Sequence, residues 1–354
     1  MADLPATAGE TQARATILSI QGLRKDFGDF TALAGIDLDV LDGEFLTIVG
    51  PSGSGKSTLI RILVGMEEPS EGAVFLRGKR INDVPANRRP TCMVFQSLAL
   101  FPHRSVGENI EFPLKIRGEA KARRRARALE LLQLLRLPVD YYGKRIQDCS
   151  GGERQRIALA RALAFDPDIL FFDEPLSALD FRLRKTLEKE LKDLHERTGK
   201  TFVYITHSLE EAMVMSDRIA IMRAGRFEQI GVPDEIYTRP LSRFVAEFMG
   251  EVNLLPLPAE GRFRVAEGVT PCAGLLMVRP ESLRFLRAGE TAPLEIDGNL
   301  HSDYDLGARF QFLIDSDAGQ ITVETLRETR PDLAQGATVR VGCDPDHWYV
   351  IEDN

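Results

Sequence analysis

The chain has 354 residues, of which 44% are hydrophobic and 28% carry a charged side chain. This length and composition are typical of a soluble globular protein with two domains. The formal net charge of -8 argues against nucleic acid as a principal ligand, because binding to a phosphate backbone needs a basic surface.

Neither a membrane span nor a secretory signal is evident. No apolar run approaches the ~20 residues that a spanning helix needs, and residues 1–15 lack a basic start followed by an apolar core. We predict a short disordered tail over 1–15 and expect any work at a membrane to need a partner. The cysteines Cys92, Cys149, Cys272 and Cys343 form no C-x-x-C pair and no zinc spacing, which predicts reduced structural thiols.

A glycine-rich run follows the first predicted strands. Strands are predicted over residues 17–23 and 36–40, and the apolar run 45–49 leads directly into the glycine-rich segment. That segment consists of Gly50, Pro51, Ser52, Gly53, Ser54, Gly55, Lys56, Ser57 and Thr58, and a helix-like run over 59–63 follows it. Strand, glycine-rich turn and helix are the setting of a phosphate-binding loop, in which backbone N–H groups surround phosphate oxygens at the positive end of the helix.

Two side chains of this loop suit a nucleotide. Lys56 would place a cation beside the β- and γ-phosphates. Ser57 would offer its hydroxyl to Mg²⁺. The loop therefore predicts a nucleotide site that works with Mg²⁺.

The middle of the chain alternates between strands and helices. Strands are predicted over residues 73–76, 169–172 and 201–205, and helices over residues 119–137, 152–164, 186–198 and 208–215. The strand 169–172 is apolar without alternation, as expected for a parallel strand that is buried on both faces. The alternation predicts an α/β domain with a mostly parallel sheet.

Two carboxylates, Asp173 and Glu174, follow the strand 169–172 directly. At the C-terminal end of a buried strand, Asp173 would hold Mg²⁺ through water beside the phosphate-binding loop. Glu174 would accept a proton from a water that attacks the γ-phosphate. The alternative is that both residues only begin a solvated loop, but the phosphate-binding loop in the same chain favours the catalytic interpretation.

A second candidate anion site begins at Ser150. Its side chain is suited to cap a helix that starts near Gly152, and Gly151 and Gly152 leave the first N–H groups accessible. The chain already has a complete phosphate-binding loop. This second helix start is therefore best explained if it completes the nucleotide site of another copy.

The segment from Cys149 to Arg156 resembles the signature of ATP-binding-cassette (ABC) ATPases. Two positions depart from the family pattern, with Cys149 where leucine is usual and Glu153 where glutamine is frequent. Other family motifs appear in the expected order, and each is represented by one residue here: Phe27 for the aromatic that stacks on adenine, Gln96 for the Q-loop, Asp180 for the D-loop (177–180) and His207 for the H-loop.

The resemblance implies roles for these residues. Lys56 and the loop glycines would bind the phosphates of ATP, while Ser57, Gln96 and Asp173 would serve Mg²⁺. Glu174 would polarise the attacking water, and His207 would contact the γ-phosphate. From the residues alone, a lone histidine is more often structural, and an aromatic near the N-terminus such as Phe27 is often part of a core.

The resemblance also implies the fold of residues 16–246, which form the cassette. We expect a P-loop NTPase fold with a RecA-like core, an antiparallel β subdomain and a helical subdomain. Two cassettes would bind two ATP molecules head-to-tail, each between the phosphate-binding loop of one copy and the signature of the other. Because the chain holds one cassette, a homodimer is expected.

Residues 247–354 differ in composition and pattern from the preceding part of the chain. They contain several prolines and short β-type runs over 275–278, 310–314, 321–323, 338–341 and 348–351. The pattern predicts a second, all-β and barrel-like domain. It resembles the OB-like regulatory (TOBE) domains of importer cassettes. Together with the context of Gln96, it is most similar to the spermidine/putrescine branch, which also contains importers of ferric iron, opines and phosphonates; sugar importers carry a similar domain.

The resemblance implies partners and a location. Two integral-membrane permease subunits and an extracytoplasmic solute-binding protein are expected, with the chain at the cytoplasmic face of the inner membrane. The apolar segment 97–103 would receive a permease helix, or else pack on its own domain. Rival interpretations are a cassette ATPase that acts on nucleic acid or ribosomes, and a P-loop kinase or GTPase, which would leave the Ser150 motif without a role.

Overall fold

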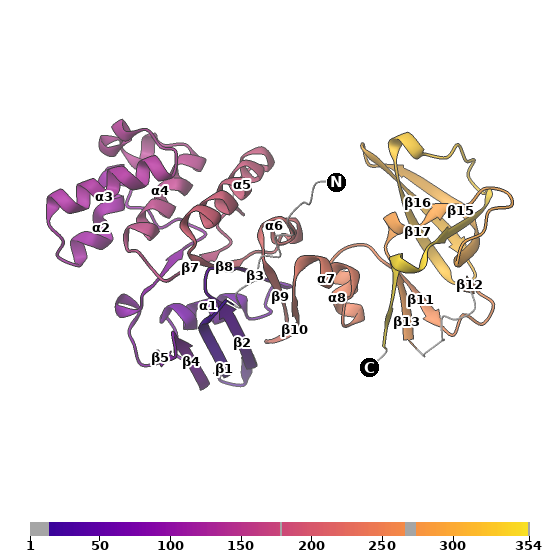
Figure 1. The fold of residues 1–354 in the computed structure, drawn as a ribbon, viewed down its shortest axis with the longest axis horizontal. Helices are drawn as coiled ribbons and strands as arrows, with labels where there is room; N and C mark the ends of the chain where they lie inside the picture. The colour runs from indigo at the N-terminus through magenta and orange to yellow at the C-terminus, as the bar shows by residue number, and fades with distance from the viewer. Residues whose placement is uncertain (1–13, 178, 266–273, 353–354) are drawn as a thin grey trace, which may run out of the picture. The chain divides into compact units, whose positions relative to one another are not determined.

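The computed structural model describes residues 14–177, 179–265 and 274–352. Most of the predicted N-terminal tail, Ala178 of the D-loop and Cys272 lie outside these residues, and the three other cysteines are unpaired thiols. The chain forms two compact units, Met1–Ile230 and Gly231–Asn354 (Figure 1). Among the described helices, none combines the length and the apolar composition that crossing a bilayer requires.

The core of the first unit is a six-stranded sheet with the order β10-β9-β3-β8-β7-β6. Its strands are β3 (Phe45–Val49), β6 (Thr91–Val94), β7 (Ile169–Asp173), β8 (Thr201–Ile205), β9 (Arg218–Arg223) and β10 (Arg226–Gly231). The pairs between β6, β7, β8, β3 and β9 are all parallel. Every residue of β3 and β8 is buried, as expected where helices or a second sheet cover both faces.

A second, antiparallel sheet has the order β2-β1-β4-β5. It contains β1 (Thr16–Phe27), β2 (Phe30–Leu41), β4 (Glu71–Leu76) and β5 (Lys79–Arg80). One hydrophobic cluster joins side chains of this sheet, of helix α1 (Lys56–Val64) and of the parallel sheet. α1 is thereby fixed between two sheets, with its N-terminus at the glycine-rich loop.

Helices on the other side of the parallel sheet form a separate cluster with it. They are α2 (Val106–Ile116), α3 (Lys121–Leu134), α4 (Gly151–Ala164), α5 (Phe181–Thr198) and α6 (Leu209–Met215). Figure 1 shows α2, α3 and α4 gathered into one helical group. The predicted α/β architecture with an antiparallel and a helical subdomain is confirmed.

In the second unit, the described residues form two short α-helices and two sheets. The helices are α7 (Pro233–Thr238) and α8 (Arg243–Phe248); the strands are β11 (Asn253–Leu257), β12 (Arg264–Val265), β13 (Gly274–Val278), β14 (Arg284–Phe285), β15 (Leu294–Asp305), β16 (Arg309–Ser316), β17 (Gly319–Leu326), β18 (Thr338–Cys343) and β19 (Trp348–Ile351). The sheet orders are β11-β13-β19 and β14-β18-β15-β16-β17, with β12 paired to β15. The predicted all-β character of the C-terminal domain is confirmed.

The second unit begins at Gly231, sixteen residues before position 247, at which the composition of the sequence changes. The unit begins earlier because α7 and α8 are grouped with the β domain. The buried guanidinium of Arg279 donates hydrogen bonds to the carbonyl oxygens of Tyr237 (3.0 Å) and Ala246 (3.0 Å). The hydroxyl of Tyr237 donates to Glu281 (2.6 Å). These contacts link residues distant in sequence, which composition alone does not reveal.

Candidate functional site

The glycine-rich loop joins β3 to α1 in a tight path that only glycine permits at two positions. A Cβ atom on Gly50 would lie 2.0 Å from the carbonyl oxygen of Met222. Gly55 has φ 108° and a Cβ there would lie 2.6 Å from the carbonyl oxygen of Ala32. The backbone can therefore turn closely around a phosphate group at the N-terminus of α1.

Lys56 is held inside this loop and is only 7% exposed. Its ammonium group donates to the carbonyl oxygens of Gly50 (2.7 Å) and Pro51 (2.9 Å). Burial lowers the pKa of Lys56, while Glu174 and Asp173 oppose that shift. The cation is thus pre-positioned, with its charge facing the two carboxylates that follow β7.

A cavity of about 470 Å³ opens over the loop. It brings together most of the predicted phosphate-binding residues with the two predicted catalytic side chains. Its lining consists of Phe30, Ala32, Gly50, Ser52, Gly53, Ser54, Gly55, Lys56, Ser57, Thr58, Glu174 and His207. Four separate segments of the sequence thus meet at one site, large enough for part of a nucleotide.

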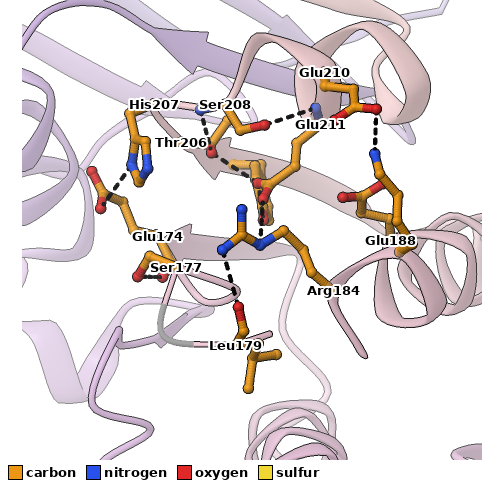
Figure 2. A network of polar contacts seen from close by, with 12 residues as sticks. Glu174, Ser177, Leu179, Arg184, Glu188, Thr206, His207, Ser208, Glu210 and Glu211 are labelled. Atoms are coloured by element: carbon orange, nitrogen blue, oxygen red, sulfur yellow. Dashed lines mark hydrogen bonds and ion pairs between the residues drawn. The ribbon is translucent and has the colours of Figure 1, made fainter. Parts of the chain in front are cut away.

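Glu174 and His207 both line this cavity, and their side chains point toward one another (Figure 2). The Nδ1 atom of His207 lies 3.3 Å from the Oε2 atom of Glu174. Glu174 has φ 46°, and its amide donates to the carbonyl oxygen of Ile205 (3.0 Å). A non-glycine residue in this region is strained, and such strain concentrates at functional sites.

A buried network fixes the residues beside His207 (Figure 2). The Glu211 carboxylate, on α6, accepts hydrogen bonds from Tyr204 and Thr206, both at 2.8 Å. The Thr206 hydroxyl also accepts from the Ser208 amide (3.0 Å). The sequence analysis did not identify Glu211, because its role depends on burial and not on a local motif.

Asp173 ends β7 beside Glu174 and suits a bound cation. Burial and then Glu174 raise the pKa of Asp173, while Arg61 and Lys56 oppose the shift. A cation placed between these two adjacent carboxylates and a phosphate would reduce the repulsion between the carboxylates. Ser57 has a hydroxyl, Gln96 an amide oxygen and Asp173 a carboxylate, and such oxygen groups are the ligands that Mg²⁺ prefers.

Gln96 reaches the site through one intermediary. Its Nε2 atom donates to the hydroxyl of Ser177 (3.0 Å), and that hydroxyl donates to the carbonyl oxygen of Glu174 (2.9 Å). The amide oxygen of Gln96 thus stays available for another partner. Ser177 is a linking residue that the sequence analysis had assigned only to the D-loop pattern.

Phe27 lies at the turn between β1 and β2, paired with Phe30. The two residues are 48% and 62% exposed, so Phe27 is not part of a core. Phe30 lines the cavity, whereas Phe27 is not among the lining residues. The sequence analysis missed Phe30, although its position next to the turn is a signal that could have identified it.

The signature residues are not in this cavity. Ser150 caps α4 in a capping box, accepting from the Glu153 amide (3.3 Å) while Glu153 accepts from the Ser150 amide (2.8 Å). Gly151 and Gly152 form the first turn of α4. Asp180 caps α5 by accepting from the Leu183 amide (3.0 Å). Ser150, Gly151, Gly152 and Asp180 do not line their own chain's cavity.

Comparison with known proteins agrees with this geometry. Residues 33–177 match the family described as ABC transporter, and residues 276–351 match the TOBE domain. The spermidine/putrescine import ATP-binding protein PotA of Methylococcus capsulatus is 41% identical over 364 residues, covering 96% of this chain and 92% of that protein. PotA of Roseobacter denitrificans is 49% identical over 245 residues, covering 69% of this chain and 67% of that protein.

A solved structure described as the dimeric structure of a bacterial ABC transporter cassette has a TM-score of 0.55 and 33% identity. The match covers 61% of this chain and 99% of the cassette. The matched share is close in size to the first unit, Met1–Ile230. The chain therefore belongs to the ABC transporter family, as an ATPase with an N-terminal cassette and a C-terminal TOBE domain.

Proposed function

We propose that this chain is the ATP-hydrolysing subunit of an importer for polyamines such as spermidine and putrescine. The observation that carries the proposal is the meeting of Lys56, Glu174 and His207 around one cavity over the glycine-rich loop. The relatives in Methylococcus capsulatus and Roseobacter denitrificans are both named as spermidine/putrescine import proteins, which favours this solute over ferric iron, phosphonates, opines or sugars.

In the proposed reaction, the loop N–H groups and Lys56 bind the β- and γ-phosphates of ATP. Adenine stacks on the exposed ring of Phe27, outside the cavity, whose own aromatic lining residue is Phe30. Glu174 accepts a proton from the attacking water, and the nearby imidazole of His207 contacts the γ-phosphate. When Mg²⁺ is bound through Ser57, Gln96 and Asp173, it neutralises charge that develops on the phosphates.

A head-to-tail homodimer would complete each site. The start of α4 presents free N–H groups beside Ser150 but does not line the cavity of its own chain. A helix start of this kind, set apart from the phosphate-binding cavity of its own chain, fits the γ-phosphate of a second copy. A related cassette is described as dimeric, which supports a dimer of this chain.

The importer would need further subunits. Two permeases would cross the membrane, a binding protein outside the membrane would select the polyamine, and this chain would lie at the cytoplasmic face. The segment 97–103 would receive a permease helix through partly buried apolar side chains such as Leu98 and Leu100. The net negative charge of the whole chain gives no reason to propose nucleic acid as a partner.

Uptake in cells tests the whole proposal. The gene is deleted in its own organism, and the uptake of radiolabelled spermidine and putrescine is compared with that of ferric iron, a phosphonate and a sugar. The wild-type chain should restore polyamine uptake, whereas Lys56→Ala should not. A defect confined to another solute would reassign the substrate, and normal uptake of all solutes would contradict the importer role.

A further inference from the structure

The segment after Gln96 contains two consecutive residues in the left-handed backbone region. Leu98 has φ 59° and Ala99 has φ 47°, a conformation that residues other than glycine seldom adopt. The Leu98 amide donates to the carbonyl oxygen of Phe95 (2.8 Å) and closes the turn. Contacts from outside the turn must hold it in this shape, since neither Leu98 nor Ala99 favours it alone.

One arginine binds both carbonyl groups of this turn. The guanidinium of Arg161 donates from Nη1 to Ala99 O and from Nη2 to Leu98 O, each at 2.7 Å. Burial lowers the pKa of Arg161, and the group that opposes this shift is the thiol of Cys92, not a carboxylate. The two carbonyl oxygens are therefore the principal hydrogen-bond partners of a partly buried charge, so losing them destabilises the turn.

A second clamp holds the next part of the segment. The buried side chain of Asn109, on α2, accepts from the Phe101 amide (2.8 Å) and donates to the Phe101 carbonyl oxygen (3.2 Å). The ring of Phe101 packs against Phe112, with 4.5 Å between centroids, and the guanidinium carbon of Arg161 lies 5.7 Å from the same ring. The segment is thus fixed from α2 and from α4.

Helix α4 connects this turn to the signature. It begins at Gly151, directly after Ser150, and continues without interruption to Ala164, with Arg161 in its last turn. At about 1.5 Å per residue, Arg161 lies roughly 16 Å along the helix axis from Ser150. A continuous helix of this length transmits a displacement from one end to the other.

We propose that Arg161 is a positioning residue that makes the segment 97–103 and the signature helix move together. This inference rests on the proposed function, in which that segment receives a permease helix. A permease that displaces the segment would pull on α4 through the two hydrogen bonds of Arg161, and thereby on Ser150. Without them, the strained turn would relax and absorb the displacement.

The substitution Arg161→Met tests this, because methionine keeps an unbranched apolar stem but has no donors. In the purified full-length chain, we expect basal ATPase within about threefold of wild type with an unchanged KM for ATP. Amides of residues 97–103 should exchange with deuterium about tenfold faster. Polyamine uptake by cells carrying the variant should fall about tenfold or more.

A rescue and a matched control make the result specific. Ala99→Gly removes the strain at residue 99, because glycine adopts positive φ without steric cost. The double variant Arg161→Met/Ala99→Gly should therefore regain slower exchange of the turn but not uptake, because the two hydrogen bonds to α4 are still missing. Arg124→Met is the control: Arg124, on α3, loses two hydrogen bonds, to Glu111 (3.3 Å) and to the carbonyl oxygen of Glu119 (2.8 Å), but does not touch the turn. It should leave exchange of residues 97–103 and uptake unchanged.

Two results would overturn the inference. One is an Arg161→Met chain with wild-type exchange and uptake; the other is a loss of basal ATPase and uptake in equal proportion. If Arg161→Met does not fold, Arg161→Lys replaces it, since it keeps the charge but not the two-pronged geometry. Failure of the proposed function would look different, because the wild-type chain itself would then support no polyamine uptake.

Discussion

Glu174 combines a strained backbone with a position between two other functional groups. Its carboxylate faces His207, and its carbonyl oxygen accepts the hydrogen bond that links it to Gln96 through Ser177. A residue fixed at φ 46° by these partners has little freedom to move when a nucleotide enters. Such pre-organisation suits a general base, which must lie within hydrogen-bond reach of the attacking water.

Glu174→Gln should separate binding from chemistry. The amide keeps the size and the polar contacts of the side chain but cannot accept a proton, so ATP binding should persist while turnover falls by about 100-fold or more. Nucleotide titration by calorimetry and steady-state phosphate release measure the two effects. A Glu174→Gln chain that hydrolyses ATP at the wild-type rate would show that another group is the base.

The sequence predicted the residues of this site where a local pattern carries the chemistry. Lys56 and Glu174 each belong to a short motif next to a buried strand, and both line the cavity. Ser177, Glu211 and Arg161 act through hydrogen bonds to residues far along the chain or in another element, which a local pattern does not contain. Tertiary contact, not residue type, gives them their roles.

At the scale of the element, the start of α4 shows how one family departure is accommodated. Glu153 closes the capping box on Ser150 and also accepts from Tyr141 (2.9 Å) and Lys144 (3.1 Å). Burial opposes the ionised form, but the Ser150 amide, Lys144 and Tyr141 outweigh it and lower the pKa of Glu153. A carboxylate is thus stabilised at the positive end of a helix, where glutamine would carry no charge.

Glu153→Ala should lower the free energy of unfolding by about 1 kcal/mol, the usual cost of losing a cap interaction. Glu153→Gln should lower it by less, because glutamine also fits a capping box.

The lowered pKa of Glu153 determines how this difference in stability depends on pH. The advantage of wild type over Glu153→Gln should be complete above about pH 4.3, the ordinary pKa of glutamate, and disappear as the pH falls through the lower folded value.

Urea unfolding followed by circular dichroism at several pH values measures this difference, with Glu190→Gln as a control on a carboxylate outside the cap. A gap between wild type and Glu153→Gln that grows on acidification would contradict the assigned role of the charge.

Elements differed in how far the sequence predicted them. β7 and β8 were predicted because an uninterrupted apolar run has few alternatives, and both occur at the expected place. The sequence analysis did not predict α2, since Pro113 lies inside it and its capping box at Ser105 is its main local signal. It also missed β15, whose 12 residues include Gly298 and several carboxylates; pairing with β16 and β18 determines its structure.

At the scale of the whole molecule, the two units have separate hydrophobic cores. The chain has one tryptophan, Trp348, which packs against the core of the second unit. The longer helices all belong to the first unit. Tryptophan fluorescence and the helical signal in circular dichroism therefore report on different units.

Nucleotide should stabilise the first unit alone. ADP with Mg²⁺ at 100 times its Kd should stabilise the helical signal by about 2.7 kcal/mol through mass action, while the Trp348 transition stays in place. Lys56→Ala serves as the control and should abolish the shift. Equal shifts of both signals would mean that the units unfold as one cooperative body.

Mixing two inactive variants tests the head-to-tail dimer. Lys56→Ala removes ATP binding, and Gly151→Leu blocks the signature without disturbing its own chain, since a Cβ on Gly151 meets only Leu179, at 3.6 Å. Gly152 is unsuitable because a Cβ there lies 2.9 Å from Leu183.

Each variant alone should be inactive, because every site in its dimer lacks one half. In a mixed dimer, the intact loop of the Gly151→Leu copy faces the intact signature of the Lys56→Ala copy. An equal mixture should regain about a quarter of the wild-type ATPase rate, since half of random pairs are mixed and each holds one complete site of two. An inactive mixture, or a Gly151→Leu chain that hydrolyses ATP normally alone, would mean that each copy completes its own site.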